Sequence, residues 1–330
     1  MNPQRRTLLT SLLAFAVPIL GIPLTVDQAP AQSYPVRPVK IIVGFPAGSS
    51  ADILGRVYAQ KLSERLKQQF IVENRPGASG NLAADIVARS EPDGYTIVVG
   101  SVANTISMSI LQDLKFSFTD DLAPIAAVAD APNVLTVTPS LGVSSVADLI
   151  KLAGKKPGEI LYGSPGAGSA PHLAGELFNL MASVKLTHIP YQGVPASLTD
   201  LLGGRISVVY GTAPTVAGYV KDGRVKLLAV TSVKRTALLP DVPTLDESGL
   251  KGFDTSIWYG FFAPKNTPLE VRKTIAGALM ASNEEPDVRK VLSANGADPM
   301  KITIDDLSAF VRADAMKWKG VVEAARISVR

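Results

Sequence analysis

Histidine, serine and glycine are the residues through which this chain could do chemistry, since it has two histidines and no cysteine. His172 and Glu176 are four residues apart, a spacing that on a helix could supply two of the four ligands of a zinc site. No further ligands follow at a suitable spacing, so we interpret His172 as a structural residue at a helix start. His188 lies in an apolar stretch and is interpreted as a core or strand-end residue. We therefore expect no metal site.

Nucleophile and nucleotide-binding motifs are missing. The chain has neither a G-x-S-x-G elbow nor a Gly-x-x-x-x-Gly-Lys-Ser/Thr loop. The run Gly166-Ala167-Gly168-Ser169-Ala170-Pro171 begins like a dinucleotide fingerprint but has proline where the third glycine belongs. Because no set of nucleophile and base is visible, we expect no enzymatic activity and no cofactor. A transferase or hydrolase on an α/β scaffold is the disfavoured alternative.

Two small polar turns could bind an anion. The first runs from Phe45 to Asp52 and the second from Gly163 to Ser169. At a helix start, free backbone N–H groups and the positive end of the helix dipole favour a carboxylate or a phosphate. Ser49 and Asp52 have the S-x-x-D spacing of a capping box, so we expect them to cap a helix and to leave other amides for a ligand. Gly48, without a Cβ, is expected to give a ligand room near the backbone. Glycine-rich turns equally serve tight connections.

The elements that would position these turns alternate between short β-rich runs and amphipathic segments, the pattern of an α/β protein with parallel sheets. The expected strands are 39–44, 70–73, 95–100, 122–130, 134–138, 160–163, 185–189, 206–210, 225–231 and 256–263. The expected helices are 52–68, 80–89, 171–181, 196–202, 214–220, 268–282, 285–294 and 304–325. Each turn follows a strand and precedes a helix, where open α/β sheets bind ligands.

The expected elements fall into two domains. The segment Ala131-Pro132-Asn133 separates two strands, and 256–263 is interpreted as the strand that returns to the first domain. We therefore expect domain 1 to comprise residues 34–131 and 256–330, and domain 2 residues 132–255. Two α/β domains joined by two crossings can close over a cleft by a hinge motion.

The first residues have the layout of a secretory signal peptide. Arg5 and Arg6 precede an apolar run from Leu8 to Val17, and Ala29-Pro30-Ala31 fits an A-x-A cleavage site. A retained membrane anchor is the less favoured alternative, because a bilayer span takes about 20 apolar residues. We expect residues 1–31 to be removed on export to the periplasm, by the Sec or the twin-arginine route.

The charge and composition exclude other classes of protein. The formal net charge of +4 is spread along the chain, with no run of five basic residues and no interleaving of basic and aromatic residues. Nucleic acid is therefore not an expected partner. With 46% hydrophobic and 19% charged residues, the chain has the composition of a globular protein rather than of a disordered one.

Ordered motifs run from Tyr34 into the last expected helix. They are Tyr34-Pro35, Phe45-Pro46-Ala47-Gly48 with Asp52, Glu73 to Ala78 with Gly80, Pro92 to Thr96, Tyr162-Gly163-Ser164, His172 to Phe178, His188 to Tyr191 with Gly193, Asp200 to Gly204 and Leu239 to Thr244. Together they strongly resemble the substrate-binding proteins of tripartite tricarboxylate transporters, the Bug (Bordetella uptake gene) family. The resemblance implies an α/β periplasmic binding protein of type II, with two domains and a ligand cleft between them.

The resemblance also implies partners. These are a small organic carboxylate (a dicarboxylate, an amino acid or an aromatic acid) and the membrane permease subunits of a tripartite tricarboxylate-type transporter. We expect the protein itself to be a monomer. A periplasmic carboxylate receptor that feeds a membrane sensor is the alternative, since it would use the same cleft.

In the family, uncharged groups and backbone amides of the two turns hold the ligand carboxylate, aided by ordered water. Carried over to this chain, the expected ligand-binding residues are Phe45, Ala47, Gly48, Ser49, Ser50 and Asp52 in domain 1, and Ser164, Gly166, Ala167, Gly168, Ser169 and Tyr191 in domain 2. Ser101 and Asn104, which follow the third strand, are expected to line the cleft. The chain departs from the usual family residues at Ala47, Ser49, Ser169, Gln192 and Gly211, which leaves the identity of the carboxylate open.

Overall fold

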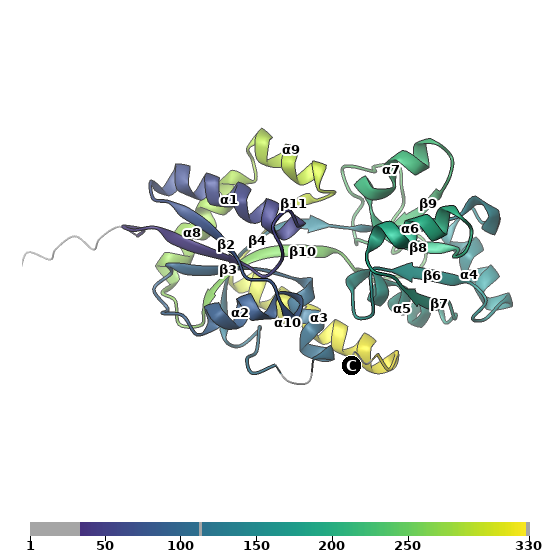
Figure 1. Ribbon diagram of the computed structural model, residues 1–330, viewed down its shortest axis with the longest axis horizontal. Helices are drawn as coiled ribbons and strands as arrows, with labels where there is room; N and C mark the ends of the chain where they lie inside the picture. The colour runs from purple at the N-terminus through teal and green to yellow at the C-terminus, as the bar shows by residue number, and fades with distance from the viewer. Residues whose placement is uncertain (1–33, 112–113, 328–330) are drawn as a thin grey trace, which may run out of the picture. The chain divides into compact units, whose positions relative to one another are not determined.

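Two mixed β-sheets with helices packed around them make up the computed structural model (Figure 1). It describes residues 34–111 and 114–327, so the expected signal peptide, residues 1–31, lies outside the described residues. Within those ranges no helix is both long and apolar enough to cross a membrane.

The first sheet has six strands in the order β11-β4-β10-β3-β1-β2. These strands are β1 (Val39–Val43), β2 (Phe70–Asn74), β3 (Thr96–Ser101), β4 (Leu122–Ala131), β10 (Ile257–Pro264) and β11 (Asp298–Thr303). β1 pairs in parallel with β2 and β3, whereas β10 runs antiparallel between β3 and β4. Tyr259 of β10 lies opposite Ser101 at the end of β3. This register sets a tyrosine beside the point where the chain leaves β3.

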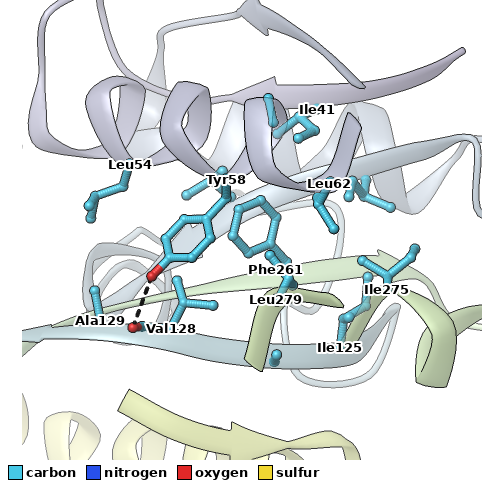
Figure 2. Packing of buried hydrophobic residues seen from close by; sticks show 14 of the residues in the cluster. Ile41, Leu54, Tyr58, Leu62, Ile125, Val128, Ala129, Phe261, Ile275 and Leu279 are labelled. Atoms are coloured by element: carbon cyan, nitrogen blue, oxygen red, sulfur yellow. Dashed lines mark hydrogen bonds between the residues drawn. The ribbon is translucent and has the colours of Figure 1, made fainter. Parts of the chain in front are cut away.

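Helices cover this sheet. They are α1 (Ser50–Leu66), α2 (Asn81–Ala88), α3 (Val102–Ile110), α8 (Leu269–Ser282), α9 (Pro286–Ala294) and α10 (Ile304–Ala324). The buried face of α1 packs on the sheet through Leu54, Tyr58 and Leu62, which contact the core around Phe261 (Figure 2). The Tyr58 hydroxyl donates to the Val128 carbonyl at 3.3 Å, so the buried phenol keeps a hydrogen bond. This packing fixes α1, and with it the turn before Ser50.

The second sheet has five strands in the order β7-β6-β8-β5-β9. These strands are β5 (Asn133–Val137), β6 (Leu161–Ser164), β7 (Thr187–Pro190), β8 (Val208–Thr212) and β9 (Lys226–Val230). β6 pairs in parallel with β7 and β8, and β5 runs antiparallel between β8 and β9. The helices of this part are α4 (Val146–Lys155), α5 (Ala170–Ala182), α6 (Val194–Leu202) and α7 (Ala213–Lys221).

The chain passes between the sheets from β4 to β5 and again before β10. At these crossings the Thr231 N–H donates to the Asn133 carbonyl, and the Thr231 hydroxyl accepts from the Asn133 N–H at 3.0 Å. Leu173 of α5 packs into the same cluster as Trp258 and Trp318. The described residues from Tyr34 onward thus form one compact unit by their contacts. The expected domain limits follow the division of strands between the sheets, but the limits themselves stay a prediction.

The expected elements end within two residues of the observed ones. The expectation of parallel sheets is wrong for β4, β5, β9, β10 and β11, which pair antiparallel. The physical reason for most of these pairs is that β5 and β10, which the chain enters from the other sheet without a crossover helix, each run between two strands of the opposite direction. The sequence pattern predicts none of α3, α4 and β11.

Candidate functional site

A cleft of about 360 Å³ is lined by elements of both sheets. Its walls are residues 49–51, 101–103, 106–107 and 165–171, together with Phe45, Ser79, Ile257 and Tyr259. Six of these residues are serines, and none carries a charged side chain. A ligand in this cleft therefore meets hydroxyls, peptide groups and apolar side chains rather than ions.

The first wall is the start of α1. The Ser49 hydroxyl caps the helix by accepting from the Asp52 N–H at 3.3 Å, as its spacing predicts. The first bond of the helical ladder joins the Ile53 N–H to the Ser49 carbonyl at 2.9 Å. The amides of Ser50 and Ala51 precede this bond, so the ladder does not use them. Both residues line the cleft, at the positive end of a 17-residue helix.

Asp52 supports this wall from behind and does not line the cleft. Its buried carboxylate accepts from the Gly48 N–H at 2.9 Å, from Arg56 at 3.1 Å and from Asn74 at 2.8 Å. Burial by itself would raise the pKa of Asp52, but these hydrogen bonds hold the pKa below its usual value. Ala47 and Gly48 also lie outside the lining. A Cβ built on Gly48 would meet open space, so glycine is not needed here to make room for a ligand, contrary to our expectation. Glycine is needed because the backbone has a φ of +82° at this position.

The second wall is the start of α3. Ser101 and Asn104 form a capping box, in which Asn104 Oδ1 accepts from the Ser101 N–H at 3.0 Å. The Asn104 amide also donates to Asn81 Oδ1 at 3.1 Å, which ties α3 to the start of α2. Ser101 lines the cleft, whereas Asn104 is buried behind it. The pair thus presents the first turn of α3 to the cleft.

The third wall is the turn before α5. Ser169 caps this helix by accepting from the His172 N–H, and the first ladder bond joins Leu173 N–H to the Ser169 carbonyl at 3.0 Å. Gly166, Ala167, Gly168 and Ser169 line the cleft.

Two further expected residues stand outside this third wall. Ser164 is fully buried behind the turn, where its hydroxyl donates to the Gly166 carbonyl at 3.0 Å. The Tyr191 hydroxyl donates to Asp200 at 2.8 Å and does not reach the lining.

Eight of the fourteen expected residues therefore line the cleft, and six do not. Those in the lining are Phe45, Ser49, Ser50, Ser101, Gly166, Ala167, Gly168 and Ser169. Those outside it are Ala47, Gly48, Asp52, Asn104, Ser164 and Tyr191. Whether any of the fourteen binds a ligand stays a prediction.

Sequence reasoning missed the wall that β10 contributes. Ile257 and Tyr259 line the cleft from the strand that returns to the first sheet. Burial raises the pKa of Tyr259 to about 12, an effect that Ser50 opposes, so the phenol is a neutral donor at neutral pH. The alternation of side chains along 256–263 could have indicated that Ile257 and Tyr259 face the same side, because residues two apart share a face of a strand. Ser79 and Ser107 were missed as well, since neither stands in an expected turn.

This arrangement suits an anion and does not suit a metal ion. Three helix starts, those of α1, α3 and α5, meet at one cleft, and each brings backbone N–H groups and a positive dipole end. His172 Nε2 and Glu176 Oε1 are 3.9 Å apart. Across the described ranges no group of three or more His, Asp or Glu residues could hold a metal ion.

Comparison with known proteins gives a consistent family. The family model described as "Tripartite tricarboxylate transporter family receptor" matches residues 54–327. Protein BugT of Bordetella pertussis is 32% identical over 96% of this chain and 97% of its own length.

Solved structures are similar too. Rpa4515 of R. palustris, solved with adipate, is 35% identical with a TM-score of 0.73, over 89% of this chain and 99% of the other. MatC (Rpa3494) from Rhodopseudomonas palustris, solved with bound malate, is 27% identical with a TM-score of 0.69, over 88% of this chain and all of the other. The expected fold, an α/β binding protein with two domains and a cleft between them, is thereby confirmed.

Proposed function

Since the chain belongs to the tripartite tricarboxylate transporter receptor family, we propose that it captures a small organic carboxylate in the periplasm and delivers it to the membrane permease subunits of such a transporter. Receptors of this family bind solutes and are not enzymes, and we extend this to the present chain: it releases its ligand chemically unchanged. One observation carries the proposal, namely that three helix starts meet in one cleft without a charged side chain.

A carboxylate is the group that these walls would hold best. Hydrogen bonds to a charged acceptor contribute about 1.5–3 kcal/mol each in mutational series. The amides of Ser50, Ala51 and Val102 precede the ladders of α1 and α3, that of Ala167 belongs to the turn before α5, and that of Ala170 to the first residue of α5. Two or three such bonds would account for a large share of the roughly −8 kcal/mol of a micromolar complex.

The body of the ligand would lie against apolar side chains. Phe45, Ile106 and Ile257 line the cleft between the helix starts. Adipate and malate, the compounds in the two related structures, are both dicarboxylates with a short carbon chain. We infer that this chain takes a ligand of the same class, with one carboxylate near α1 and α3 and the other near α5.

The test is a thermal-shift and calorimetric screen of the protein against adipate, malate, glutamate and benzoate, with adipamide as the uncharged control. A ligand that binds only the folded form raises the melting temperature with its concentration. We expect a dicarboxylate to do so and adipamide not to. If no carboxylate stabilises the protein, the proposal is wrong. Recovery of the bound compound unaltered after long incubation, and uptake that needs both this chain and permease subunits in vesicles, test the remaining parts.

One variant removes a proposed amide without removing the helix. Ala51→Pro deletes the N–H at the second position of α1, and this chain already has proline at that position in α5, α6 and α7. We expect Ala51→Pro to weaken adipate binding at least about tenfold, which is about 1.4 kcal/mol. The matched control is Ala147→Pro, at the second position of α4 and outside the cleft, which should bind as the wild type does. Equal binding by both variants would show that the Ala51 amide holds no ligand.

A further inference from the structure

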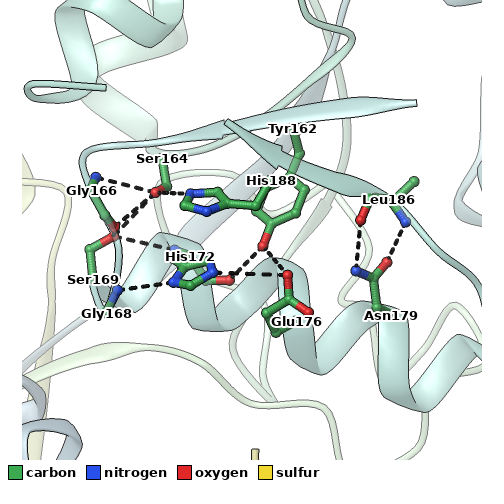
Figure 3. Close-up of polar contacts among 10 residues, drawn as sticks. All are labelled: Tyr162, Ser164, Gly166, Gly168, Ser169, His172, Glu176, Asn179, Leu186 and His188. Atoms are coloured by element: carbon green, nitrogen blue, oxygen red, sulfur yellow. Dashed lines mark hydrogen bonds and ion pairs between the residues drawn. The ribbon is translucent and has the colours of Figure 1, made fainter. Parts of the chain in front are cut away.

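Two histidines stack directly behind the turn that begins α5 (Figure 3). His172 comes from α5 and His188 from β7, and their ring centroids are 3.8 Å apart with the planes inclined by 20°. His172 is buried and His188 half-buried. Neither ring lines the cleft, yet both contact residues that hold its third wall.

The hydrogen bonds fix the protonation state of His172. Its Nδ1 accepts from the Gly168 N–H at 2.9 Å. An accepting Nδ1 carries no proton, so the neutral ring carries its proton on Nε2, which faces Glu176 Oε1 at 3.9 Å. A proton added to Nδ1 would set two N–H groups against each other and break the bond to Gly168.

His188 acts through a serine. The Ser164 hydroxyl donates its proton to the Gly166 carbonyl at 3.0 Å. The same oxygen accepts from the Gly166 N–H at 3.2 Å and lies 2.7 Å from His188 Nε2. The tautomer of His188 sets which of the two atoms donates in this short bond, and in either direction the bond ties the Ser164 side chain to the ring. His188 thus positions Ser164, and Ser164 bonds the N–H of Gly166 and shares its carbonyl with Ser169.

We propose that His172 and His188 are positioning residues, which as a neutral stacked pair hold the turn Pro165–Ser169 in the shape that presents the Ala167 amide to the cleft, since the amides of Gly166, Gly168 and Ser169 bond within the protein. The effect on ligand affinity rests on the proposed function. The effect on the turn does not, because it concerns hydrogen bonds within the protein.

The surroundings keep the pair neutral. Burial lowers the pKa of His172 to about 4, aided by the neighbouring His188, and burial lowers the pKa of His188 to about 4. The carboxylate of Glu176 on α5 lies 3.9 Å from His172 Nε2, and its Oε1 accepts from the Tyr162 hydroxyl of β6 at 2.6 Å. Burial raises the pKa of Tyr162 and of Tyr210 on β8, so both phenols stay neutral. Among the residues that the structure describes, α3 and α10 add no ion pair to either ring.

The first experiment compares variants of α5 at pH 7.5. His172→Ala removes the acceptor of the Gly168 N–H, and His172→Asn replaces Nδ1 by an amide oxygen at a similar position. The matched control is Asn179→Ala, which breaks two bonds between α5 and Leu186 away from the turn (Figure 3). With adipate as the probe, we expect His172→Ala to bind about tenfold more weakly, His172→Asn to recover most of the loss, and Asn179→Ala to keep its affinity although it is less stable. Equal losses of affinity in His172→Ala and Asn179→Ala would show that His172 contributes only to the stability of the fold, and would overturn the proposal.

The second experiment needs no ligand. In ¹⁵N-labelled protein titrated from pH 7.5 to pH 3.5, the Gly168 amide resonance should shift with the midpoint of the His172 imidazole, near pH 4. In a His172→Asn/His188→Gln variant, where both hydrogen bonds are kept and neither group titrates, the resonance should stay in place. A Gly168 resonance that ignores the protonation of His172 would overturn the proposal. If adipate and the other carboxylates fail to bind at pH 7.5, the proposed function is wrong. The titration would still test whether His172 holds the turn, because it needs no ligand.

Discussion

Gly48 shows how a single residue can shape a wall of the cleft without lining it. Its φ of +82° lets the chain turn from β1 into α1, and its N–H donates to the carboxylate of Asp52. A side chain would meet no atom there, so only the left-handed backbone requires glycine. The turn that carries Ser49 and Ser50 therefore depends on the backbone conformation at Gly48.

We expect Gly48→Ala to lower the free energy of unfolding by about 1 kcal/mol, since a Cβ disfavours the left-handed conformation. The strained turn should also bind adipate more weakly. Gly142→Ala is the control, because Gly142 has a φ of +73°, equally open space and a place outside the cleft. Urea denaturation and calorimetry of both variants separate the effects: similar losses of stability are expected, with a loss of affinity in Gly48→Ala alone. If Gly48→Ala bound adipate with unchanged affinity, the conformation of this turn would not matter for binding in the cleft.

The sequence identifies the segments that form the cleft better than it identifies the side chains that face it. Asp52 and Asn104 both stand three residues after a capping serine, and both turn back to cap a backbone N–H. That spacing indicates a cap and could have removed them from the expected lining. Ser164 and Tyr191 could not be removed in this way, because their partners, His188 and Asp200, are contacts of the folded chain.

Among the elements, α3 is the one that the sequence hides. Its residues VANTISMSI are mostly β-branched or serine, which are weak helix formers. The helix is held by its capping box and by packing, including a bond of 2.6 Å from the Thr105 hydroxyl to the buried Asp314. β11 is hidden for another reason, since its ladder to β4 is irregular between Pro299 and Ile302. By contrast, α4 carries the Ser145 and Asp148 cap spacing and could have been predicted.

Asn104→Ala tests the role of the capping box of α3. The change leaves the buried Ser101 N–H and Asn81 Oδ1 without their partner, so we expect a loss of about 2–4 kcal/mol in the free energy of unfolding. Binding of adipate should weaken too, since the start of α3 would be released. Ser145→Ala removes the exposed cap of α4 and should cost only about 1 kcal/mol, with no change in affinity. Denaturation and calorimetry measure both quantities, and a similar small loss in the two variants would contradict a special role for Asn104.

At the scale of the whole molecule, the crossings between the sheets contain a carboxylate that resists ionisation. Asp130, the residue before the last of β4, lies opposite Trp258 of β10 and Asp298 of β11. Burial raises the pKa of Asp130 to about 7, and Asp254 and Asp298 add to the shift, while Ser256 and Lys317 oppose it. The proton on Asp130 therefore belongs to the folded state between about pH 4 and pH 7.

A raised acid pKa stabilises the protein at low pH, and this stability is lost as the pH rises through the interval from 3.8 to about 7. Asp130→Asn cannot ionise, so we expect it to be more stable than the wild type at pH 8, by up to about 4 kcal/mol. The difference should shrink towards pH 4. Asp241→Asn, in an exposed loop, should follow the wild type at both pH values. Melting curves across this range would contradict the prediction if the Asp130→Asn difference did not grow with pH.

The sequence predicts two of the three helix starts at the cleft, but it does not predict that the three lie close together. The turns before α1 and α5 have local signals, namely a strand, small residues and a capping serine. Their approach depends on contacts far apart in sequence, such as Leu173 against Trp258 and Trp318. The wall from β10 depends on the antiparallel register of Tyr259 with Ser101. A single sequence contains neither the contact nor the register.

The peptide groups at the starts of α1, α3 and α5 are not encoded by any one side chain. Most point substitutions along the walls leave an N–H where it was, because every residue except proline supplies one. The side chains between them, such as Ile106 and Ile257, are free to change in size and polarity. If these groups hold an acid as proposed, mutation can alter the fit for the body of a ligand while the hydrogen bonds to its acid group persist, so that a lineage of such receptors can acquire new ligands without first losing the means of holding the old ones.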